Sequence, residues 1–392
     1  MLLVVAGVLF AAGSHKVTSS FSGDVSLYEH YARAALSSPM LHSMPVEYPA
    51  AALAIYVLPL ALPVPYAMGF ALLAALAGVA LVLSSDGFPE YPGWSKRTCY
   101  YLLIATAAVV FARYDVFPAL ASVLAVEDAR RDKWGRAWLW AVVGGLLKLF
   151  PFLLLPGFLL IERAQTGKWA FRRLGATCAG LTIVVIAQYC LSPKSLLSPL
   201  MYQVHRGFEL SSLQGSVSFL LDPFHAYWIG GYGSIEVVGK GAAVISAVTI
   251  VVTVVAMMAV WALARRARLS VVAVSLAILS LAVFSEKSFA PQYLIWLAPF
   301  WAYWPMRRGW LAAALLTTFV FPVLYFQAYG GPSSGFYLPT VVAVVRNVVL
   351  VVATVQWFCE QVRLQDQGEC EAPDEVRADT IEKAWTFAAR SG

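Results

Sequence analysis

The sequence predicts an all-α polytopic membrane protein, and three observations lead to that class. Of the 392 residues, 60% are apolar and only 13% are charged. A soluble domain carries about 25% charged residues, so this chain has more apolar surface than a water-soluble core could bury. Long apolar runs also alternate with short polar segments along most of the chain. Helices are expected for these runs, because a helix satisfies its own backbone hydrogen bonds in lipid.

Apolar runs that we predict as membrane segments occur from the first residue onward. In chain order they are residues 1–13, 66–83, 99–112, 115–126, 174–191, 239–264, 269–285, 290–305, 309–329 and 338–358. The first run is short for a span of about 20 residues. It has no basic n-region and no cleavage site of small residues, so we interpret it as a membrane helix rather than a signal peptide.

Two further runs are predicted to be broken. Residues 49–62 contain Pro49 and Pro59, and this run is too short and too interrupted to cross. Residues 137–161 are interrupted at Lys148 and Pro151, where the missing amide donor and the ring of proline should open the helix. With these re-entrant elements the bundle is expected to hold about 11–12 transmembrane segments.

The charges predict the orientation. If the N-terminus is cytosolic and 49–62 enters from the outer side without crossing, most Lys and Arg residues fall in cytosolic loops. All five histidines then lie outside, in or near two long outer loops at about 14–48 and 192–238. We therefore predict a multi-pass plasma-membrane protein whose active site faces outside the cytosol.

The same pattern divides the chain and excludes some partners. Residues 1–358 form the transmembrane domain, and 359–392 form an acidic cytosolic tail. The net charge of +6 does not indicate nucleic acid, because the basic residues occur as short clusters between apolar runs. The five cysteines show no metal-ligand spacing and no disulfide framework, and no metal or cofactor is expected.

In the first outer loop, Asp24, Tyr28 and Tyr31 recur at i, i+4 and i+7, so a short helix would present all three on one face. The Asp24 carboxylate could act as a general base toward a sugar hydroxyl. An N-cap is the alternative interpretation, since Asp24 follows Gly23 at a helix start. Glu47 is the second carboxylate of this loop, as a site residue or as a solvated rim residue.

Charged residues also occur at membrane boundaries. Arg113 and Asp115 lie in a tight outer turn, either as a mutual ion pair or as a ligand-binding pair. Lys148 sits at the predicted helix break with apolar residues on both sides. A broken helix in a membrane lines a cavity, so we favour a functional lysine over one that only snorkels to the interface.

The second outer loop contains a polar cluster suited to sugar or phosphate recognition, although any loop of this length would hold polar residues. Its members are His205, Arg206, Glu209, Gln214 and Ser216. The guanidinium of Arg206 could bind a phosphate with two hydrogen bonds.

A later segment places Glu286, Lys287, Gln292 and Tyr293 at the outer mouth of a helix. Lys287 is a candidate counter-ion for a phosphate. Anchoring in the aromatic belt explains Tyr293 and Trp296 equally well.

Taken together, these segments resemble the GT-C membrane glycosyltransferases, specifically glycosyltransferase family 87. The motifs that carry the resemblance occur in order, and they are Asp24 with Tyr28, Tyr48-Pro49, Arg113 to Asp115, Lys148 to Pro151, and Ala290 to Tyr293. Two features depart from the family pattern. Pro49-Ala50 replaces a double proline, and no second acid stands beside Asp24, so a bound divalent cation is not supported.

The resemblance implies a GT-C-like bundle and an enzyme that transfers a sugar, typically mannose, from a polyprenyl-phosphate donor to a lipid-linked or glycan acceptor. Transfer would invert the anomeric centre, with Asp24 as the base that deprotonates the acceptor. A polyprenyl phosphate leaves readily, so the enzyme needs cations rather than a strong acid. The phosphate-binding candidates are Arg113, Lys148, Arg206 and Lys287. The acceptor- or sugar-binding candidates are Tyr28, Glu47, His205 and Gln292.

Two other functions compete with this prediction. A secondary transporter would place coupled carboxylates inside the bundle, whereas the acids of the chain body lie in loops or at boundaries, and no inverted repeat is visible. Another lipid-modifying transferase would need a nucleophile or a His–Asp pair, and His205 and Asp222 are too loosely spaced to indicate one.

Overall fold

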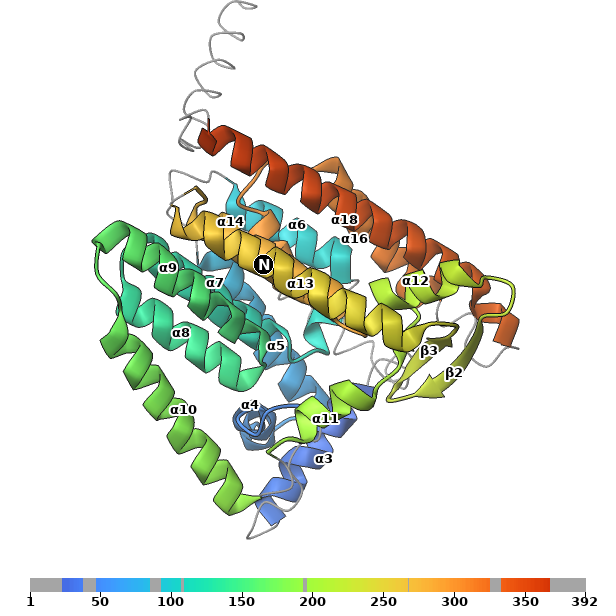
Figure 1. Cartoon of the computed structure of the whole chain (residues 1–392). Coiled ribbons are helices and arrows are strands. Elements are labelled where there is room, and N and C mark those ends of the chain that lie inside the picture. Colours follow the sequence, from blue (N-terminus) through green and yellow to red (C-terminus); the bar gives the residue numbers. More distant parts are fainter. Residues whose placement is uncertain are drawn as a thin grey trace, which may run out of the picture.

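The computed structural model describes residues 23–37, 47–84, 93–106, 109–192, 196–266, 268–324 and 333–366. The predicted first span, 1–13, and the tail from residue 367 onward lie outside these residues. The described part is mostly helical, as the sequence predicts, and it includes one small β-sheet (Figure 1).

The N-terminal half consists of helices joined by short connections. They are α3 (Gly23–Ser37), α4 (Ala52–Val57), η1 (Leu58–Ala61), α5 (Tyr66–Leu83), α6 (Trp94–Thr106), η2 (Val109–Phe111), α7 (Val116–Arg130), α8 (Trp134–Leu147), η3 (Phe150–Leu153), α9 (Leu154–Thr166) and α10 (Phe171–Leu191).

The C-terminal half contains the sheet and the longest helices. Its elements are α11 (Ser198–His205), β1 (Phe208–Glu209), α12 (Leu213–Leu221), β2 (Tyr227–Gly231), β3 (Ser234–Val238), α13 (Ala242–Arg265), α14 (Val271–Ser285), η5 (Pro291–Tyr293), α15 (Leu294–Trp301), α16 (Arg308–Thr318), η6 (Phe319–Leu324), η7 (Ser333–Phe336) and α18 (Tyr337–Asp366).

Four helices are long and apolar enough to cross a bilayer, namely α5, α10, α13 and α18. Helix α10 has no buried residue along its 21 residues and lies apart at one edge of the molecule (Figure 1). Helix α13 buries only Ile245, Met257, Val260 and Ala264 of its 24 residues. Apolar surface of this extent is stable in contact with lipid, which identifies the chain as a membrane protein.

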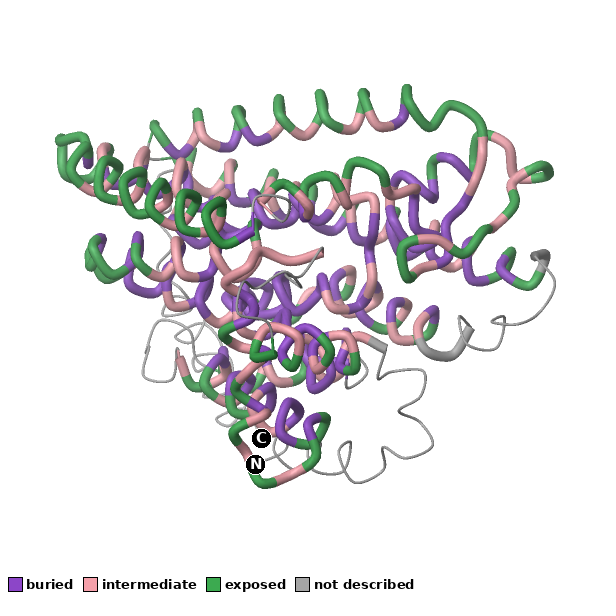
Figure 2. Tube along the Cα trace, turned by 90° about the horizontal axis from the view of Figure 1, so that it is seen from below, coloured by how far each residue is buried: buried purple, intermediate pink, exposed green. Residues whose placement is uncertain are grey.

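Where the structure describes them, the other predicted spans contain shorter helices. The run 115–126 forms α7, and 290–305 forms η5 and the 8-residue α15. Helix α18 extends beyond the predicted end at residue 358 and continues to Asp366. Every residue of α15 and most of α14 are buried, so these elements belong to the core. Figure 2 shows that buried residues gather in the middle of the molecule.

The two predicted breaks are confirmed. Between α8 and α9 the chain leaves the helix at Lys148, whose backbone is extended (φ −151°, ψ 133°), and continues through η3, which contains Pro151. Helix α4 has only 6 residues and ends in a 4-residue 3-10 turn at Pro59. The start of the first broken run lies near the second break, because the Lys148 ammonium is 5.5 Å from the ring centroid of Tyr48 and both Pro49 and Lys148 line one cavity.

The described part of the predicted second outer loop, residue 192 and residues 196–238, contains regular secondary structure. It forms α11, α12 and a three-stranded antiparallel sheet of order β1-β3-β2, in which Phe208 pairs with Val237 and Ile229 with Glu236. Tyr232 and Gly233 both have positive φ, as a two-residue hairpin turn requires. The sheet is the one departure from an all-α chain among the described residues.

At the opposite end of the bundle, buried acids lie at helix ends and pair with arginines. Asp128 is 3.0 Å from Arg136, and Glu162 pairs with Arg173. Glu127 accepts hydrogen bonds from Arg130 and pairs with Arg131. Each of these acids thus lies near a helix end, where it pairs with at least one arginine.

Candidate functional site

The site is built around Asp115, which immediately precedes α7 and is fully buried. Its Oδ1 accepts a hydrogen bond from Lys148 Nζ at 2.6 Å and another from Trp296 Nε1 at 2.7 Å. A buried carboxylate is stable only with such partners. The turn before α7, the α8–η3 break and α15 are thereby joined at one point.

Lys148 is surrounded by aromatic rings. Its ammonium lies 5.5 Å from the ring centroid of Tyr48, 5.4 Å from that of Tyr293 and 5.0 Å from that of Trp296. Each ring face attracts a cation at this distance. The side chain is only 16% exposed, and it lines a cavity, as the helix break predicted.

The cavity has a volume of about 300 Å³, which lies at the lower end of the range for small-molecule sites. Its apolar wall consists of Pro49, Leu149, Phe150, Leu153, Pro199, Met257, Ala282 and Trp296. Its polar lining consists of Glu47, Lys148, Gln203, Ser285, Glu286 and Tyr293. The arrangement suits a ligand with a charged end and an apolar chain.

Glu286 and Arg206 complete the charge of this region. Burial raises the pKa of the Glu286 carboxyl, and the nearby charges of Lys148 and Arg206 partly oppose the increase. Arg206 donates to Ser234 Oγ at 2.9 Å, and its guanidinium lies 3.6 Å from the carboxylate of Glu209. Arg206 Nε has no hydrogen-bond partner among the described residues, so it has capacity for a ligand.

Asp24 lies in the first turn of α3, and its carboxylate pairs with Arg113. Arg113 and Asp115 were expected either to pair with each other or to bind a ligand. They do not form the mutual ion pair, since Arg113 pairs with Asp24 and Asp115 pairs with Lys148. Asp24 is the second residue of α3 rather than its cap, so the N-cap interpretation does not describe its contact. Its side chain is 32% exposed and is not part of the cavity lining.

Arg113 is more buried than Asp24. Burial lowers the pKa of Arg113 to about 10, while Asp115, Glu209 and Tyr293 act in the opposite direction. These three residues lie near the guanidinium, which places Arg113 between Asp24 and the residues around the cavity. Its Nε lacks a hydrogen-bond partner within the described ranges.

Asp24, Tyr28 and Tyr31 lie on one helix, α3, as predicted. Tyr28 and Tyr31 are buried against neighbouring residues. Tyr28 is fully buried and stacks on Tyr56, with ring centroids 4.5 Å apart. Tyr31 donates a hydrogen bond of 2.7 Å to Glu47, which lines the cavity. Tyr48 contacts both Tyr28 and Lys148, so an aromatic cluster connects α3 to the cavity.

Two other sequence candidates lie away from the cavity. His205 is exposed and its ring nitrogen contacts the carbonyl of Met201 in its own helix, so His205 does not join the cluster. Lys287 donates to the carbonyl oxygens of Val204 (2.8 Å) and Arg206 (3.1 Å). It connects the segment after α14 to the end of α11 and thereby holds Arg206 in place.

Gln292 lies in η5 and has a buried Oε1 that lacks a hydrogen-bond partner in the described part of the chain. Gln203, on the cavity wall, has the same property. Unpaired buried amide oxygens are costly, and a ligand hydroxyl would satisfy them.

Sequence reasoning missed the structural role of Asp115 and the cavity positions of Glu286 and Gln203. Asp115 is separated from Lys148 by 33 residues and from Trp296 by 181. No local pattern reports such contacts. The only signal was the presence of a charged residue at the boundary of an apolar run.

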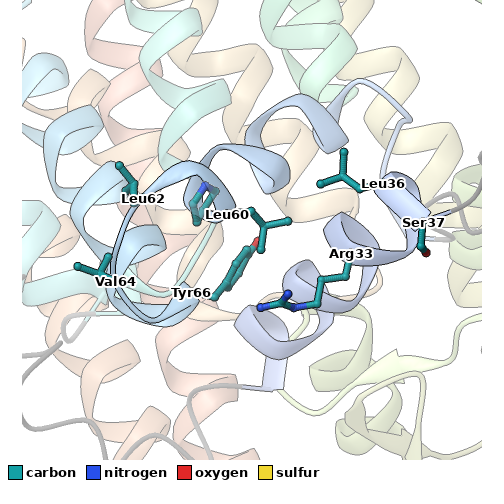
Figure 3. A pocket seen from close by; sticks show the side chains of 8 residues that line it. Arg33, Leu36, Ser37, Leu60, Leu62, Val64 and Tyr66 are labelled. Carbon is teal, nitrogen blue, oxygen red and sulfur yellow. The ribbon is translucent and has the colours of Figure 1, made fainter.

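A larger hollow of about 450 Å³ lies beside α3 and η1 (Figure 3). It is lined by Arg33, Leu36, Ser37, Pro59, Leu60, Leu62, Val64 and Tyr66. Its one charged residue, Arg33, already pairs with Glu29 at 2.7 Å. This hollow therefore offers no free charge for chemistry, and we place the site at the Lys148 cavity.

Comparisons of the chain with family models, curated proteins and solved structures found no match. Among the described residues, no group of His, Cys, Asp and Glu side chains could hold a metal ion.

Proposed function

We propose that this protein is a polyprenyl-phosphate-sugar-dependent glycosyltransferase of the GT-C type, with a bundle of about 11–12 transmembrane segments. It would transfer a sugar, mannose in the typical case, to a lipid-linked or glycan acceptor on the outer side of the plasma membrane. Its partners would be the donor, the acceptor and membrane lipid.

One observation supports the proposal: the aromatic-enclosed ammonium of Lys148 lines a cavity whose other lining residues are mostly apolar. A polyprenyl phosphate has two matching parts, an anion and a hydrocarbon chain. Arg206, which does not line the cavity but acts electrostatically on Glu286 of its wall, would supply a second cation.

The chemistry is a direct displacement. The acceptor oxygen attacks the anomeric carbon, the bond from that carbon to the phosphate oxygen breaks, and the bonding electrons leave with polyprenyl phosphate. The acceptor proton passes to a carboxylate. Lys148 and Arg206 stabilise the charge on the departing phosphate, which is the main catalytic requirement.

The proposal assigns the base to Asp24 because of its motif position. Arg113 orients the Asp24 carboxylate and extends the positive charge toward the cavity. Glu286 and Glu47 are the carboxylates on the cavity wall itself, so they are the alternative bases for the same reaction.

Transfer of radiolabelled sugar from synthetic polyprenyl-phosphate donors in membranes tests the function. Lys148→Met should reduce turnover by about 100-fold or more, the loss typical of one charge-stabilising donor. Lys168→Met is the matched control, because Lys168 is an exposed lysine outside the cavity. Equal activity of K148M and the parent would contradict the proposal.

The base is tested separately with Asp24→Asn, Glu286→Gln and Glu47→Gln. Asp24→Asn should abolish transfer while donor binding persists. If D24N retains turnover and E286Q loses it, Glu286 on the cavity wall is the base and Asp24 is not. The proposed reaction, sugar transfer from a polyprenyl phosphate, would be unchanged.

A further inference from the structure

A second groove lies at the far end of the bundle, between the C-terminal halves of α9 and α13. Its volume is about 570 Å³, and its walls are Leu160, Met258, Trp261, Ala262, Arg265 and Arg266. The cavity around Lys148 also touches α13, but at Met257, and the two linings share no residue.

The two arginines are free to bind an anion. Neither Arg265 nor Arg266 forms an ion pair with any carboxylate among the described residues. Their neighbours differ: Arg268 pairs with Asp366 at 2.9 Å, and Arg173 pairs with Glu162 of α9. Two adjacent cations without acids on a groove create a local positive potential.

The rest of the groove is apolar and continues along the surface of α13. Met258 is 61% exposed, and the exposed side chains of Val251, Val254 and Val255 lie on the preceding turns. The indole of Trp261 forms part of the groove wall. An occupant would therefore contact two cations and a long apolar strip.

We propose that this groove binds an anionic phospholipid, with its phosphate on Arg265 and Arg266 and one acyl chain along α13. Basic pockets between membrane helices bind such headgroups. The charge complementarity favours an anionic over a zwitterionic lipid, since a choline would bring a third cation to the two arginines. The proposal depends on membrane insertion and does not depend on sugar transfer.

The test uses the full-length protein in detergent micelles and follows its thermal unfolding midpoint during titration with dioleoyl phosphatidylglycerol. Dioleoyl phosphatidylcholine is the neutral comparison. The unfolding midpoint of the parent should rise with phosphatidylglycerol and should not rise with phosphatidylcholine. Arg265→Ala/Arg266→Ala should weaken the apparent affinity by about tenfold or more.

Matched variants separate a built site from general surface charge. Lys168→Ala/Arg172→Ala removes two exposed cations outside the groove, one between α9 and α10 and one in the first turn of α10, and this variant should respond like the parent. Ala262→Trp fills the groove while retaining both arginines, and it should lose the response. An equal response in all four proteins would overturn the proposal.

Two further arms exclude other occupants. Inorganic phosphate should not reproduce the stabilisation, and if it does, the groove is a free-anion site and the lipid proposal fails. The acidic segment after Asp366 is the competing occupant from the chain itself. A variant with neutral side chains in this segment tests it, namely Glu369→Gln/Glu371→Gln/Asp374→Asn/Glu375→Gln. If this variant shows a lipid response that the parent lacks, the segment fills the groove and the proposal is overturned.

Discussion

The central residue pair is Asp115 and Lys148, a fully buried carboxylate and a largely enclosed ammonium. The Asp115 charge would not be stable alone, because desolvation of a buried ion costs several kcal/mol. Together with the indole N–H of Trp296 and the three aromatic rings, they form one unit. Asp115 is thus a positioning residue for Lys148 in the proposed reaction.

Replacing Asp115 by Asn should be strongly destabilising, by about 3–5 kcal/mol, because it leaves the buried ammonium of Lys148 without its anion. The measurement is the unfolding midpoint of the purified protein in detergent. Glu29→Gln is the control, since it breaks the exposed Glu29–Arg33 pair and should change stability by less than about 1 kcal/mol. Similar midpoints for the two variants would contradict the argument.

Glu286 predicts a pH dependence of stability. Burial raises the pKa of its carboxyl in the folded protein, so the folded state binds this proton more tightly than the unfolded state. The resulting stabilisation is complete below the ordinary glutamate pKa and is lost as pH rises through the raised value.

The parent should therefore lose stability relative to Glu286→Gln as the pH rises through this window. The measurement is the unfolding midpoint of each protein at matched pH values from about 4 to 8. Subtracting one midpoint from the other at each pH removes the contribution of the titrating groups that the two proteins share. A difference that stays constant over the window, or a parent that gains stability relative to Glu286→Gln as the pH rises, would contradict the raised pKa of Glu286.

At the scale of elements, the break between α8 and α9 places Lys148 at the cavity. The break depends on close packing as well as on Pro151. A Cβ atom on Gly145, in the last turn of α8, would collide with the ring of Phe152 in η3. The helix end and the 3-10 turn can approach each other because this residue has no side chain.

Gly145→Ala should destabilise the protein by about 1–3 kcal/mol, the usual cost of overpacking, because the whole Phe152 ring has to move. Gly135→Ala is the control in the same helix. A Cβ atom on Gly135 meets nothing within 4 Å, so alanine should be neutral or stabilising by up to about 1 kcal/mol. The measurement is the unfolding midpoint of each variant relative to the parent. A smaller decrease for Gly145→Ala than for Gly135→Ala would contradict the predicted collision with Phe152.

For the whole molecule, the proposed orientation places the Lys148 cavity toward the outside and the ends of α10 and α18 on opposite sides. Cys190 lies within one turn of the end of α10 and is exposed. Cys359 is exposed near the end of α18, next to Glu360, which pairs with Arg307 at 2.6 Å. Both thiols therefore lie near charged or terminal positions, where water reaches them.

In intact cells, a membrane-impermeant maleimide should modify a variant that retains only Cys190. A variant that retains only Cys359 should be labelled only after the cells are permeabilised. A variant without cysteines gives the background. The opposite labelling pattern would reverse the proposed orientation and place the cavity in the cytosol.

Several elements were predictable because their signals are local. The spans 66–83, 174–191, 239–264 and 338–358 correspond to α5, α10, α13 and α18, since an uninterrupted apolar run determines a membrane helix. The breaks at Pro59 and Pro151 were predictable from the missing amide donors. The sheet formed by residues 208–238 was not predicted, because its short strands carry no continuous apolar pattern.

The candidate site was predictable only in part. Lys148 was identified as a cavity residue because a lysine at a helix break is an unusual combination. The partner of Asp24, the anchoring of Lys148 by Asp115 and the peripheral position of His205 were not predictable. Each of these depends on which helix ends meet, and sequence spacing carries no information about that.

The sequence by itself determined that this chain is a helical membrane protein with interrupted helices and charged residues at its boundaries, because composition and proline position act within a few residues. Only the tertiary structure decided which charges meet. Burial makes an unpaired ion unstable, so Asp115 selects Lys148 and Asp24 selects Arg113 across the fold. Those long-range pairings hold Lys148 at the cavity and Arg113 beside Asp24.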